Sequence, residues 1–261
     1  MNETNITKHI PNSITSLNLF CGSVAVILSF YGEFKSALFC MIAAAIFDFC
    51  DGFAARLLKA YSPMGKELDS LADMVSFGLA PSCLAFNKML CIWNIGFTDI
   101  FTLETKAAAG LLLPLVCTLL IAVFSALRLA KFNIDTRQSE NFIGLATPSC
   151  ALLVGSLIYS AESFPQLDGI LAANTYIIPV ISVILSLLLV SEIPMFSFKF
   201  KSLRWSENKL KFIFLICAAA FAIIEATLMG SFPLSVWIFT VLVFYILLNT
   251  SIWAYRALLK K

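Results

Sequence analysis

Long apolar runs dominate the sequence and restrict the chain to folds that are stable in a lipid bilayer. A helix needs about 20 apolar residues to cross a hydrocarbon core about 30 Å thick. Eight runs of roughly that length lie near residues 14–32, 36–58, 70–93, 107–130, 143–161, 175–193, 211–229 and 232–255. Only 13% of the residues are charged and 60% are hydrophobic, whereas about 25% are charged in a soluble domain. The sequence therefore predicts an all-α, polytopic membrane helical bundle with about eight transmembrane helices.

The basic residues predict how these spans are oriented. If the N-terminus lies in the cytoplasm, only three of the 18 lysines and arginines, Lys35, Lys88 and Lys106, fall on the opposite side. Cytoplasmic connections carry such an excess of positive charge. We therefore expect both termini, and the connection between the second and third spans, to face the cytoplasm from the inner, or cytoplasmic, membrane. The polar opening MNETNITKHIPNS does not fit a cleavable signal peptide, so we expect the first span to be kept.

The second and third spans carry a cluster of acidic residues. In DFCDGFAARLLKAYSPMGKELDSLAD, residues 48–73, Asp48 and Asp51 are three residues apart, and Asp69 and Asp73 are four apart. Residues at these spacings share one face of a helix. A charge at the bilayer centre costs at least about 2.5 kcal/mol, and four converging carboxylates repel unless cations lie between them. The spacing therefore predicts a binuclear metal site.

The ligand set and its neighbours indicate the kind of metal and substrate. Carboxylate oxygens without His or Cys favour Mg²⁺, Mn²⁺ or Ca²⁺, and Mg²⁺ is usually completed by phosphate oxygens of a substrate. Gly52 and Ala55 share the face of the first aspartate pair and leave room for a ligand. Arg56 adds a planar cation suited to a diphosphate. Glu67 lies off the face of Asp69 and Asp73, so we expect it to be a solvated acid.

Transport and cysteine chemistry are the alternatives from other functional classes. Intramembrane carboxylates also build proton and cation pathways, so an ion-coupled transporter stays open. Inverted repeats of broken helices would favour transport, and the sequence shows no convincing repeat. The eight cysteines are scattered singly with no CxxC pair, which predicts small core residues rather than disulfides or a thiolate metal site.

The acidic stretch resembles the signature of a known family. Its pattern is Asp48-x-x-Asp51-Gly52-x-x-Ala55-Arg56, then eight residues, then Gly65-x-x-x-Asp69-x-x-x-Asp73. All eight defining positions of the CDP-alcohol phosphatidyltransferases are present at the right spacing. The segments PNSITSLNLFCG, SLADMVSFGLAPS and RLAKFN…FIGLATPS are similar to the membrane-embedded phosphatidylserine synthase branch of that family.

The resemblance implies transfer of the phosphatidyl group of CDP-diacylglycerol to the hydroxyl of L-serine, with release of CMP. It implies that Asp48, Asp51, Asp69 and Asp73 hold two divalent cations, Mg²⁺ or Mn²⁺, and that Asp73 is also the catalytic base. The residues expected to contact CDP are Thr15, Asn18, Gly52, Ala55, Arg56, Gly65 and Ser76. The candidates for the serine carboxylate are Arg128, Lys131 and Asn133. Thr15 and Asn18 could instead satisfy helix backbone, and Arg128 and Lys131 could be ordinary cytoplasmic anchors.

The resemblance covers residues 11 to about 150 and implies a six-helix family core within residues 1–195, as well as a homodimer. Residues 196–261 are expected to form an amphipathic cytoplasmic segment followed by two additional transmembrane helices. The bilayer is an expected partner and nucleic acid is not. A sibling transferase that uses glycerol phosphate or inositol phosphate instead of serine stays open.

Overall fold

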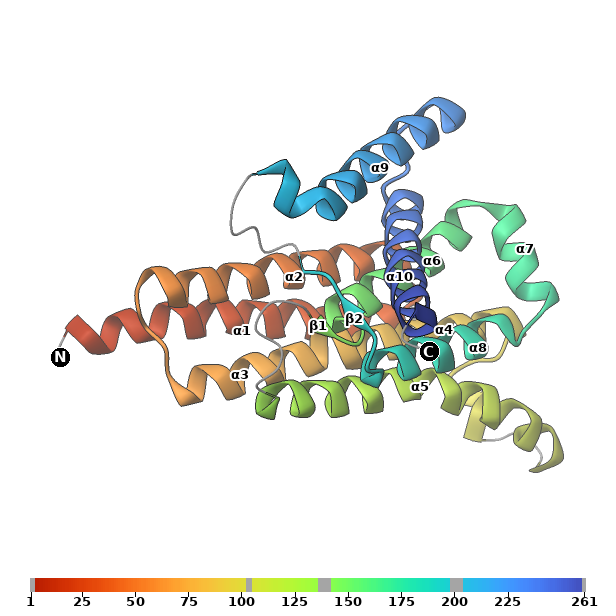
Figure 1. Cartoon of the computed structure of the whole chain (residues 1–261). Helices are drawn as coiled ribbons and strands as arrows, with labels where there is room; N and C mark the ends of the chain where they lie inside the picture. The colour runs from red at the N-terminus through yellow and green to blue at the C-terminus, as the bar shows by residue number, and fades with distance from the viewer. Residues whose placement is uncertain (1–2, 102–104, 136–141, 198–203, 260–261) are drawn as a thin grey trace.

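The computed structural model describes residues 3–101, 105–135, 142–197 and 204–259 (Figure 1). The helices are α1 (Glu3–Phe30), α2 (Phe34–Leu57), α3 (Pro63–Asp73), α4 (Ala80–Trp93), α5 (Thr105–Ile134), α6 (Thr147–Ser163), α7 (Pro165–Ala173), α8 (Ile177–Val190), α9 (Trp205–Met229) and α10 (Leu234–Leu259). A π-helical turn, η1 (Met74–Leu79), joins α3 to α4, and a short 3₁₀ turn, η2 (Asp99–Phe101), follows α4. Two short strands, β1 (Phe142–Ile143) and β2 (Pro194–Met195), pair antiparallel.

The predicted all-α membrane bundle is confirmed, with a difference in the number of spans. Within the described residues, six helical segments are long and apolar enough to cross a membrane: His9–Phe30, Phe34–Leu57, Pro63–Trp93, Leu112–Ile134, Asn208–Met229 and Leu234–Leu259. The predicted span at 143–161 corresponds to α6, whose 17 residues make a helix about 25 Å long. The predicted span at 175–193 corresponds to α8, which has 14 residues. Helix α7 precedes it at a bend of 88°, and the two helices together form either one broken span or a re-entrant loop.

Helices α1 to α5 form the body of the bundle, and α6 completes its core. Helix α1 packs against α2, α3 and α4, and α5 packs against α4, η1 and α8. Large, fully buried side chains such as Met41, Leu84 and Ile158 come from α2, α4 and α6. The N-terminus and the connection between α2 and α3 lie at one end of the bundle, and α7 lies at the other (Figure 1).

The C-terminal helices are arranged differently. In Figure 1, α10 runs across the direction of the bundle and α9 lies at an oblique angle to it, and α10 packs against α6 and β2. Both helices have the length and hydropathy of a membrane span. The division at residue 195 into a family core and two additional transmembrane helices stays a prediction.

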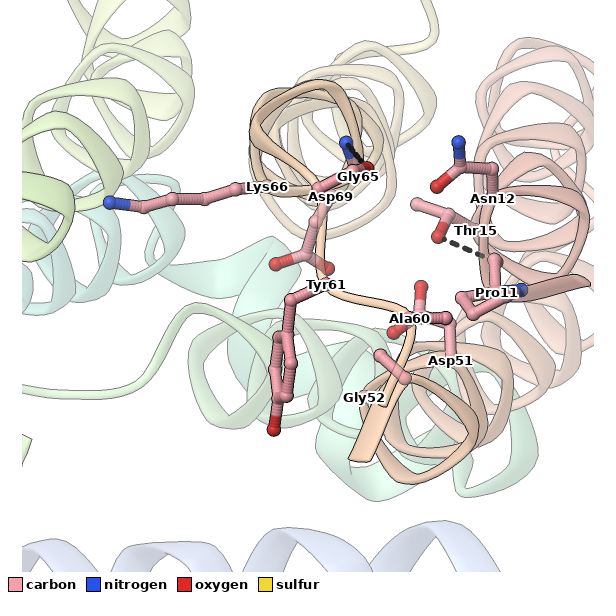
Figure 2. Close-up of a pocket in the computed structure, with 12 residues that line it drawn as sticks. Pro11, Asn12, Thr15, Asp51, Gly52, Ala60, Tyr61, Gly65, Lys66 and Asp69 are labelled. Carbon is pink, nitrogen blue, oxygen red and sulfur yellow. Dashed lines mark hydrogen bonds between the residues drawn. The ribbon is translucent and has the colours of Figure 1, made fainter. Parts of the chain in front are cut away.

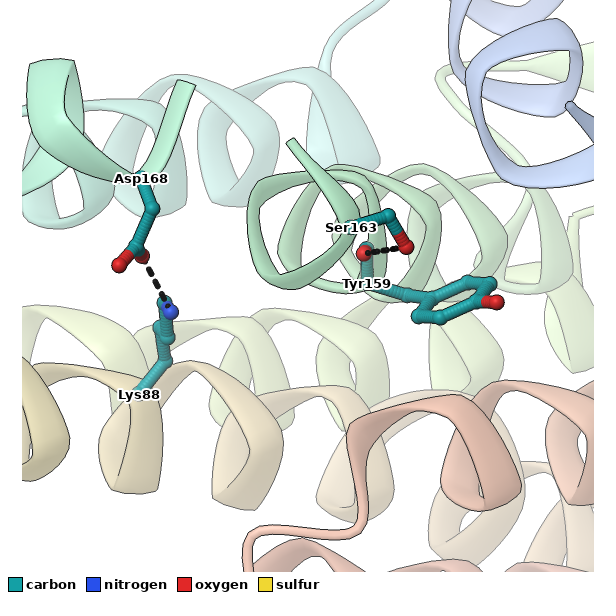
Figure 3. A network of polar contacts seen from close by, with 4 residues as sticks. All are labelled: Lys88, Tyr159, Ser163 and Asp168. Carbon is teal, nitrogen blue, oxygen red and sulfur yellow. Dashed lines mark hydrogen bonds and ion pairs between the residues drawn. The ribbon is translucent and has the colours of Figure 1, made fainter. Parts of the chain in front are cut away.

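An ion pair between buried Lys88 and half-exposed Asp168 fastens α7 to α4 at the end of the bundle away from the aspartates (Figure 3). The Lys88 side chain is only 7% exposed, and its Nζ lies 2.6 Å from Asp168 Oδ1. The ammonium also lies 5.5 Å from the centroid of the Phe34 ring. A buried charge without a partner is strongly destabilising, so this pair accounts for a lysine inside an apolar bundle. In the same region, Ser163 Oγ donates a hydrogen bond to the Tyr159 carbonyl within α6.

Close contact between α1 and η1 sets the position of the third span. Gly22 of α1 faces Ser76 of η1, and a Cβ placed on Gly22 would lie 2.7 Å from the Cα of Ser76. Ser76 Oγ donates a hydrogen bond to the carbonyl of Asn18, one turn earlier in α1. Single π turns are frequent at functional sites. Here the π turn places a serine hydroxyl against the backbone of a neighbouring helix.

We expect the substitution Gly22→Ala to destabilise the protein, because the added methyl group meets backbone that cannot move without shifting η1. Overpacking of this kind costs about 1–3 kcal/mol. The matched control is Gly110→Ala in α5, where a Cβ meets nothing within 4 Å; in a helix interior this change stabilises by about 0.5–1 kcal/mol. Thermal unfolding of the purified variants in detergent measures both. Equal melting temperatures for the two variants would contradict the close contact.

Candidate metal centre and substrate cavity

A tight turn between α2 and α3 brings the two aspartate pairs together. Helix α2 ends where Lys59 adopts a left-handed conformation, with φ 50°, and the N–H of Ala60 donates to the carbonyl of Ala55. This hydrogen bond is typical of a helix C-terminus closed by a left-handed residue. Ser62 then caps α3 by accepting a hydrogen bond from the N–H of Gly65 at 3.0 Å. The chain therefore reverses within a few residues, and α3 starts beside the end of α2.

Three of the four aspartates form an acidic triad. Asp48, Asp51 and Asp69 each offer a carboxylate oxygen, and these oxygens all lie within 4.8 Å of one another. Asp51 is only 5% exposed, and its Oδ2 has no hydrogen-bond partner in the described part of the chain. Three converging carboxylates with an unsatisfied buried oxygen fit a hard divalent cation. This triad could hold a metal ion.

The fourth aspartate is held by α1. Asp73 is 8% exposed, and Asn18 Nδ2 donates a hydrogen bond of 3.1 Å to its Oδ1. Asn18 is fully buried and its carbonyl accepts the hydrogen bond from Ser76. Asp73 lies outside the triad but near enough to Asp48 for their charges to interact. The predicted Asp73 is thus a buried carboxylate oriented by a neighbouring helix, and coordination of metal by Asp73 stays a prediction.

A cavity of about 210 Å³ opens beside the triad (Figure 2). Its lining residues are Pro11, Asn12, Thr15, Asp51, Gly52, Ala55, Ala60, Tyr61, Ser62, Gly65, Lys66 and Asp69. Figure 2 shows Asp51 and Asp69 projecting from α2 and α3 toward the same space, with Thr15 of α1 on its other side. The cavity therefore joins the triad to the N-terminal part of α1, and it has room for part of a phosphate-bearing ligand.

Most of the residues expected to contact CDP lie at this cavity. The predicted residues that line it are Thr15, Gly52, Ala55 and Gly65, together with Asp51 and Asp69 of the metal site. Arg56 is exposed, and its Nη1 lies 3.7 Å from the position that a Cβ would take on Gly52. A Cβ on Gly65 would lie 2.9 Å from Asn12 Oδ1, so glycine permits the close approach of α3 to α1.

The remaining predicted residues have other contacts. Thr15 lines the cavity, but its hydroxyl donates to the Pro11 carbonyl. It therefore satisfies helix backbone, which was the alternative role for Thr15. Asn18 and Ser76 lie outside the set of lining residues and instead position Asp73 and η1. Their contact with CDP stays a prediction.

Several cavity residues were not predicted from the sequence. Asn12, Tyr61, Ser62 and Lys66 line the cavity alongside the predicted residues. Asn12 lies in the quoted segment PNSITSLNLFCG, and Ser62 precedes Pro63 in a pattern typical of a helix start. These signals could have placed both residues near the metal site. Lys66 Nζ also donates to the carbonyl of Asn133, which links α3 to α5.

The three acceptor candidates have different environments. Arg128 is 7% exposed, near enough to Asp73 for their charges to interact, and donates from Nη1 to Thr147 Oγ1 at 3.2 Å. Its Nε has no hydrogen-bond partner among the described residues. Lys131 is partly exposed and makes an ion pair with Glu192.

Asn133 has a connecting role. Its side chain donates a hydrogen bond of 2.8 Å to Ser70 Oγ, while its carbonyl accepts from Lys66. Both contacts tie the end of α5 to α3. Of the three candidates, Arg128 is therefore the buried cation whose charge interacts with that of Asp73.

Comparison with known proteins adds independent findings. A model of the CDP-alcohol phosphatidyltransferase family matches residues 8–191, which confirms the resemblance drawn from the acidic stretch. A CDP-diacylglycerol–serine O-phosphatidyltransferase of Bacillus subtilis is 35% identical over 153 residues, which are 59% of this chain and 77% of the relative. One of Helicobacter pylori is 32% identical over 161 residues, 61% of each chain, so less than two thirds of that relative is covered. An archaetidylserine synthase of Methanothermobacter thermautotrophicus is 29% identical over 199 residues, 67% of this chain and 78% of the relative.

We expect Asp48→Asn and Asp51→Asn each to weaken Mn²⁺ binding by about tenfold or more, because each removes a charged oxygen of the triad. The matched control is Glu67→Gln, which removes the same charge from an exposed position on α3. Electron paramagnetic resonance of free Mn²⁺, titrated against detergent-solubilised protein without substrate, measures the affinity. Wild-type affinity in the Asp51 variant would rule out the triad as the metal site.

Proposed function

Because the chain belongs to the CDP-alcohol phosphatidyltransferase family, we propose that it transfers the phosphatidyl group of CDP-diacylglycerol to L-serine, giving phosphatidylserine and CMP. The observation that carries this proposal is the arrangement of Asp48, Asp51 and Asp69 around one point, beside a cavity lined by the small residues of the family signature. The names of the relatives in bacteria support serine as the acceptor. The archaeal relative is likewise named as a serine lipid synthase.

The proposed metal site holds two divalent cations, Mg²⁺ or Mn²⁺, and Ca²⁺ shares the same ligand preference. Its ligands are the oxygens of the triad together with Asp73. Bound cations would supply positive charge that neutralises the diphosphate and the departing CMP. The unsatisfied Oδ2 of buried Asp51 supports this assignment, since such an oxygen needs a positive partner.

The chain's own residues would bind and orient the nucleotide. Gly52 and Ala55 present a wall without bulky side chains, so a diphosphate can approach the backbone of α2. Arg56, which lies beside Gly52, would pair with a phosphate through its planar guanidinium. Thr15 and Gly65 close the cavity from α1 and α3.

Asp73 is the proposed catalytic base. The serine hydroxyl oxygen forms a bond to the phosphorus of the phosphatidyl group, the bond from that phosphorus to CMP breaks, and the hydroxyl proton passes to the Asp73 carboxylate. A positioned base contributes about 10²–10⁴-fold to such a step. Asn18 donates to one oxygen of Asp73, which fixes the carboxylate and leaves the other oxygen to accept the proton.

Arg128 is the proposed partner of the serine carboxylate. Serine brings one carboxylate, whereas glycerol phosphate and inositol phosphate bring a phosphate dianion that several converging cations would bind best. Among the described residues, Arg128 is a buried arginine whose charge interacts with that of Asp73, whereas Lys131 is paired with Glu192. Arg128 Nε has no partner among the described residues and is therefore able to donate to an incoming carboxylate.

The membrane setting follows from the same proposal. The excess of basic residues in one set of connections supports an active site that faces the cytoplasm from the inner membrane, with both termini on that side. The acyl chains of CDP-diacylglycerol would enter sideways from the bilayer between helices. Resemblance to the family supports a homodimer.

We expect purified protein to release CMP from CDP-diacylglycerol when L-serine is supplied, and not when glycerol phosphate or inositol phosphate is supplied. Excess EDTA should abolish release and added Mn²⁺ or Mg²⁺ should restore it. Chromatography of the lipid product identifies phosphatidylserine. Formation of phosphatidylglycerol phosphate without phosphatidylserine would overturn the acceptor and leave the reaction class intact, whereas full turnover in EDTA would overturn the metal site.

We expect Arg128→Ala to raise the KM for serine by about tenfold or more, with a smaller change in the KM for CDP-diacylglycerol, because a charged hydrogen bond to the carboxylate is lost. The comparison variant is Lys131→Ala, whose side chain is partly exposed and already paired with Glu192. Its serine KM should change less than threefold, on the order expected for an exposed pair. Steady-state kinetics with each substrate varied in turn separate the two effects. A larger serine effect in the Lys131 variant would reverse the assignment.

A further inference from the structure

A second cavity lies away from the aspartates, between β2 and the C-terminal helices. It measures about 230 Å³ and is lined by Pro194, Phe196, Asn208, Leu210, Lys211, Asn249, Ile252, Trp253 and Arg256. These residues all lie beyond residue 191, where the family match ends. Neither the family signature nor the proposed reaction gives this cavity a role.

The lining of this cavity combines positive charge with apolar surface. Lys211 comes from the start of α9 and Arg256 from the last turn of α10, and none of the described residues that line the cavity is acidic. The apolar part consists of Phe196, Leu210, Ile252 and Trp253. Two cations that converge from different helices would attract an anion, and arginine in particular matches the oxygens of a phosphate.

The walls of the cavity are fixed by hydrogen bonds. Asn249 is 4% exposed, and its Oδ1 accepts a hydrogen bond of 3.0 Å from the N–H of Phe196, while its Nδ2 donates to the carbonyl of Tyr245. The hydroxyl of Tyr245 donates in turn to the Phe196 carbonyl at 2.8 Å. Asn208, where the backbone of α9 departs from helical geometry, is also buried and donates to the Arg204 carbonyl. A ligand would therefore enter a preformed site, which lowers the entropy that binding costs.

The surrounding sequence favours a ligand at a membrane surface. The segment 199–211 carries Lys199, Lys201, Arg204, Lys209 and Lys211 against one acid, Glu207. Basic clusters next to membrane helices attract anionic lipids, and tryptophan is enriched at the level of the headgroups. Trp253 and Ile252 give the cavity the apolar side that a glycerol and acyl chain would contact, in addition to the cations that a phosphate requires.

We propose that this cavity binds the phosphate of an anionic phospholipid, with Lys211 and Arg256 contacting the phosphate and Trp253 and Ile252 contacting the glycerol or acyl part. The residues that line this cavity are separate from those of the proposed catalytic centre, which lie on α1, α2, α3 and α5. A failure of this lipid-binding proposal would therefore leave the result of the acceptor assay, and with it the proposed function, unaffected.

Native mass spectrometry of delipidated full-length protein tests the proposal, with phosphatidylglycerol and, in a parallel titration, phosphatidylcholine as the added lipid. We expect one phosphatidylglycerol site to lose affinity by about 10- to 30-fold in the double variant Lys211→Gln/Arg256→Gln, since each basic residue near a surface strengthens binding of anionic lipid. The matched control is Lys209→Gln/Lys35→Gln, which removes the same charge from exposed positions that do not line the cavity. The experiment compares the phosphatidylglycerol affinity of the wild type with that of the variant. Lipid bound at the catalytic centre is common to both and does not contribute to this difference.

An added arm separates a lipid from a free anion. Competition by inorganic phosphate and by glycerol phosphate at millimolar concentration should leave the phosphatidylglycerol site occupied if the apolar wall contributes, and complete displacement would identify a soluble phosphate as the ligand. Equal affinity of wild type and the double variant would overturn the proposal. An equal loss of phosphatidylglycerol affinity in the control variant would also overturn the proposal, because it would show a general effect of surface charge.

Discussion

Buried negative charge is the constraint on which the rest of this structure depends. Asp51 and Asp73 are almost fully buried among apolar helices, and neither makes an ion pair within the described part of the chain. The fold meets this constraint in two ways. Asp73 accepts a hydrogen bond from the side-chain amide of Asn18. The backbone carbonyl of Asn18 in turn accepts a hydrogen bond from Ser76, which holds Asn18 in place. Within the described residues, Asp51 keeps an oxygen with no hydrogen-bond partner beside Asp48 and Asp69, which is an arrangement suited to a bound cation.

The same constraint explains why small residues recur where α1, α2 and α3 meet. Gly22 allows η1 to approach α1 so that Ser76 reaches the Asn18 carbonyl, and Gly65 allows the start of α3 to approach Asn12. Close backbone approach lets short polar side chains span the gap between helices, as small residues do in membrane bundles generally. Bulk at either position would separate Asn18 from Asp73 or widen the cavity. Gly22 and Gly65 thus serve the geometry of the carboxylates.

Local pattern predicted much of this arrangement, and tertiary contacts decided the rest. The three- and four-residue spacings predicted which aspartates share a helix face. Three of the four, Asp48, Asp51 and Asp69, meet in the structure, whereas Asp73 lies outside this triad. From the sequence, Arg128, Lys131 and Asn133 were one group of candidates for the serine carboxylate. In the structure they contact different residues, which are Thr147, Glu192 and Ser70 respectively. Those partners come from distant parts of the chain, so no local pattern could distinguish the three. Hydropathy likewise predicted a span at 175–193, whereas the helix there, α8, has only 14 residues and meets α7 at an 88° bend that hydropathy could not show.

The two sides of the proposed site are supported by different parts of the chain. The metal side rests on α1, through Asn18. The acceptor side rests on the C-terminal region: Arg128 donates to Thr147, which follows β1, and β1 pairs with β2. Strand β2 is followed by Phe196, which Tyr245 and Asn249 of α10 hold through both of its backbone groups. Helix α10 is therefore linked through Phe196, β2 and β1 to the part of the chain that holds Arg128, so a helix beyond the family match is physically connected to the proposed acceptor residue.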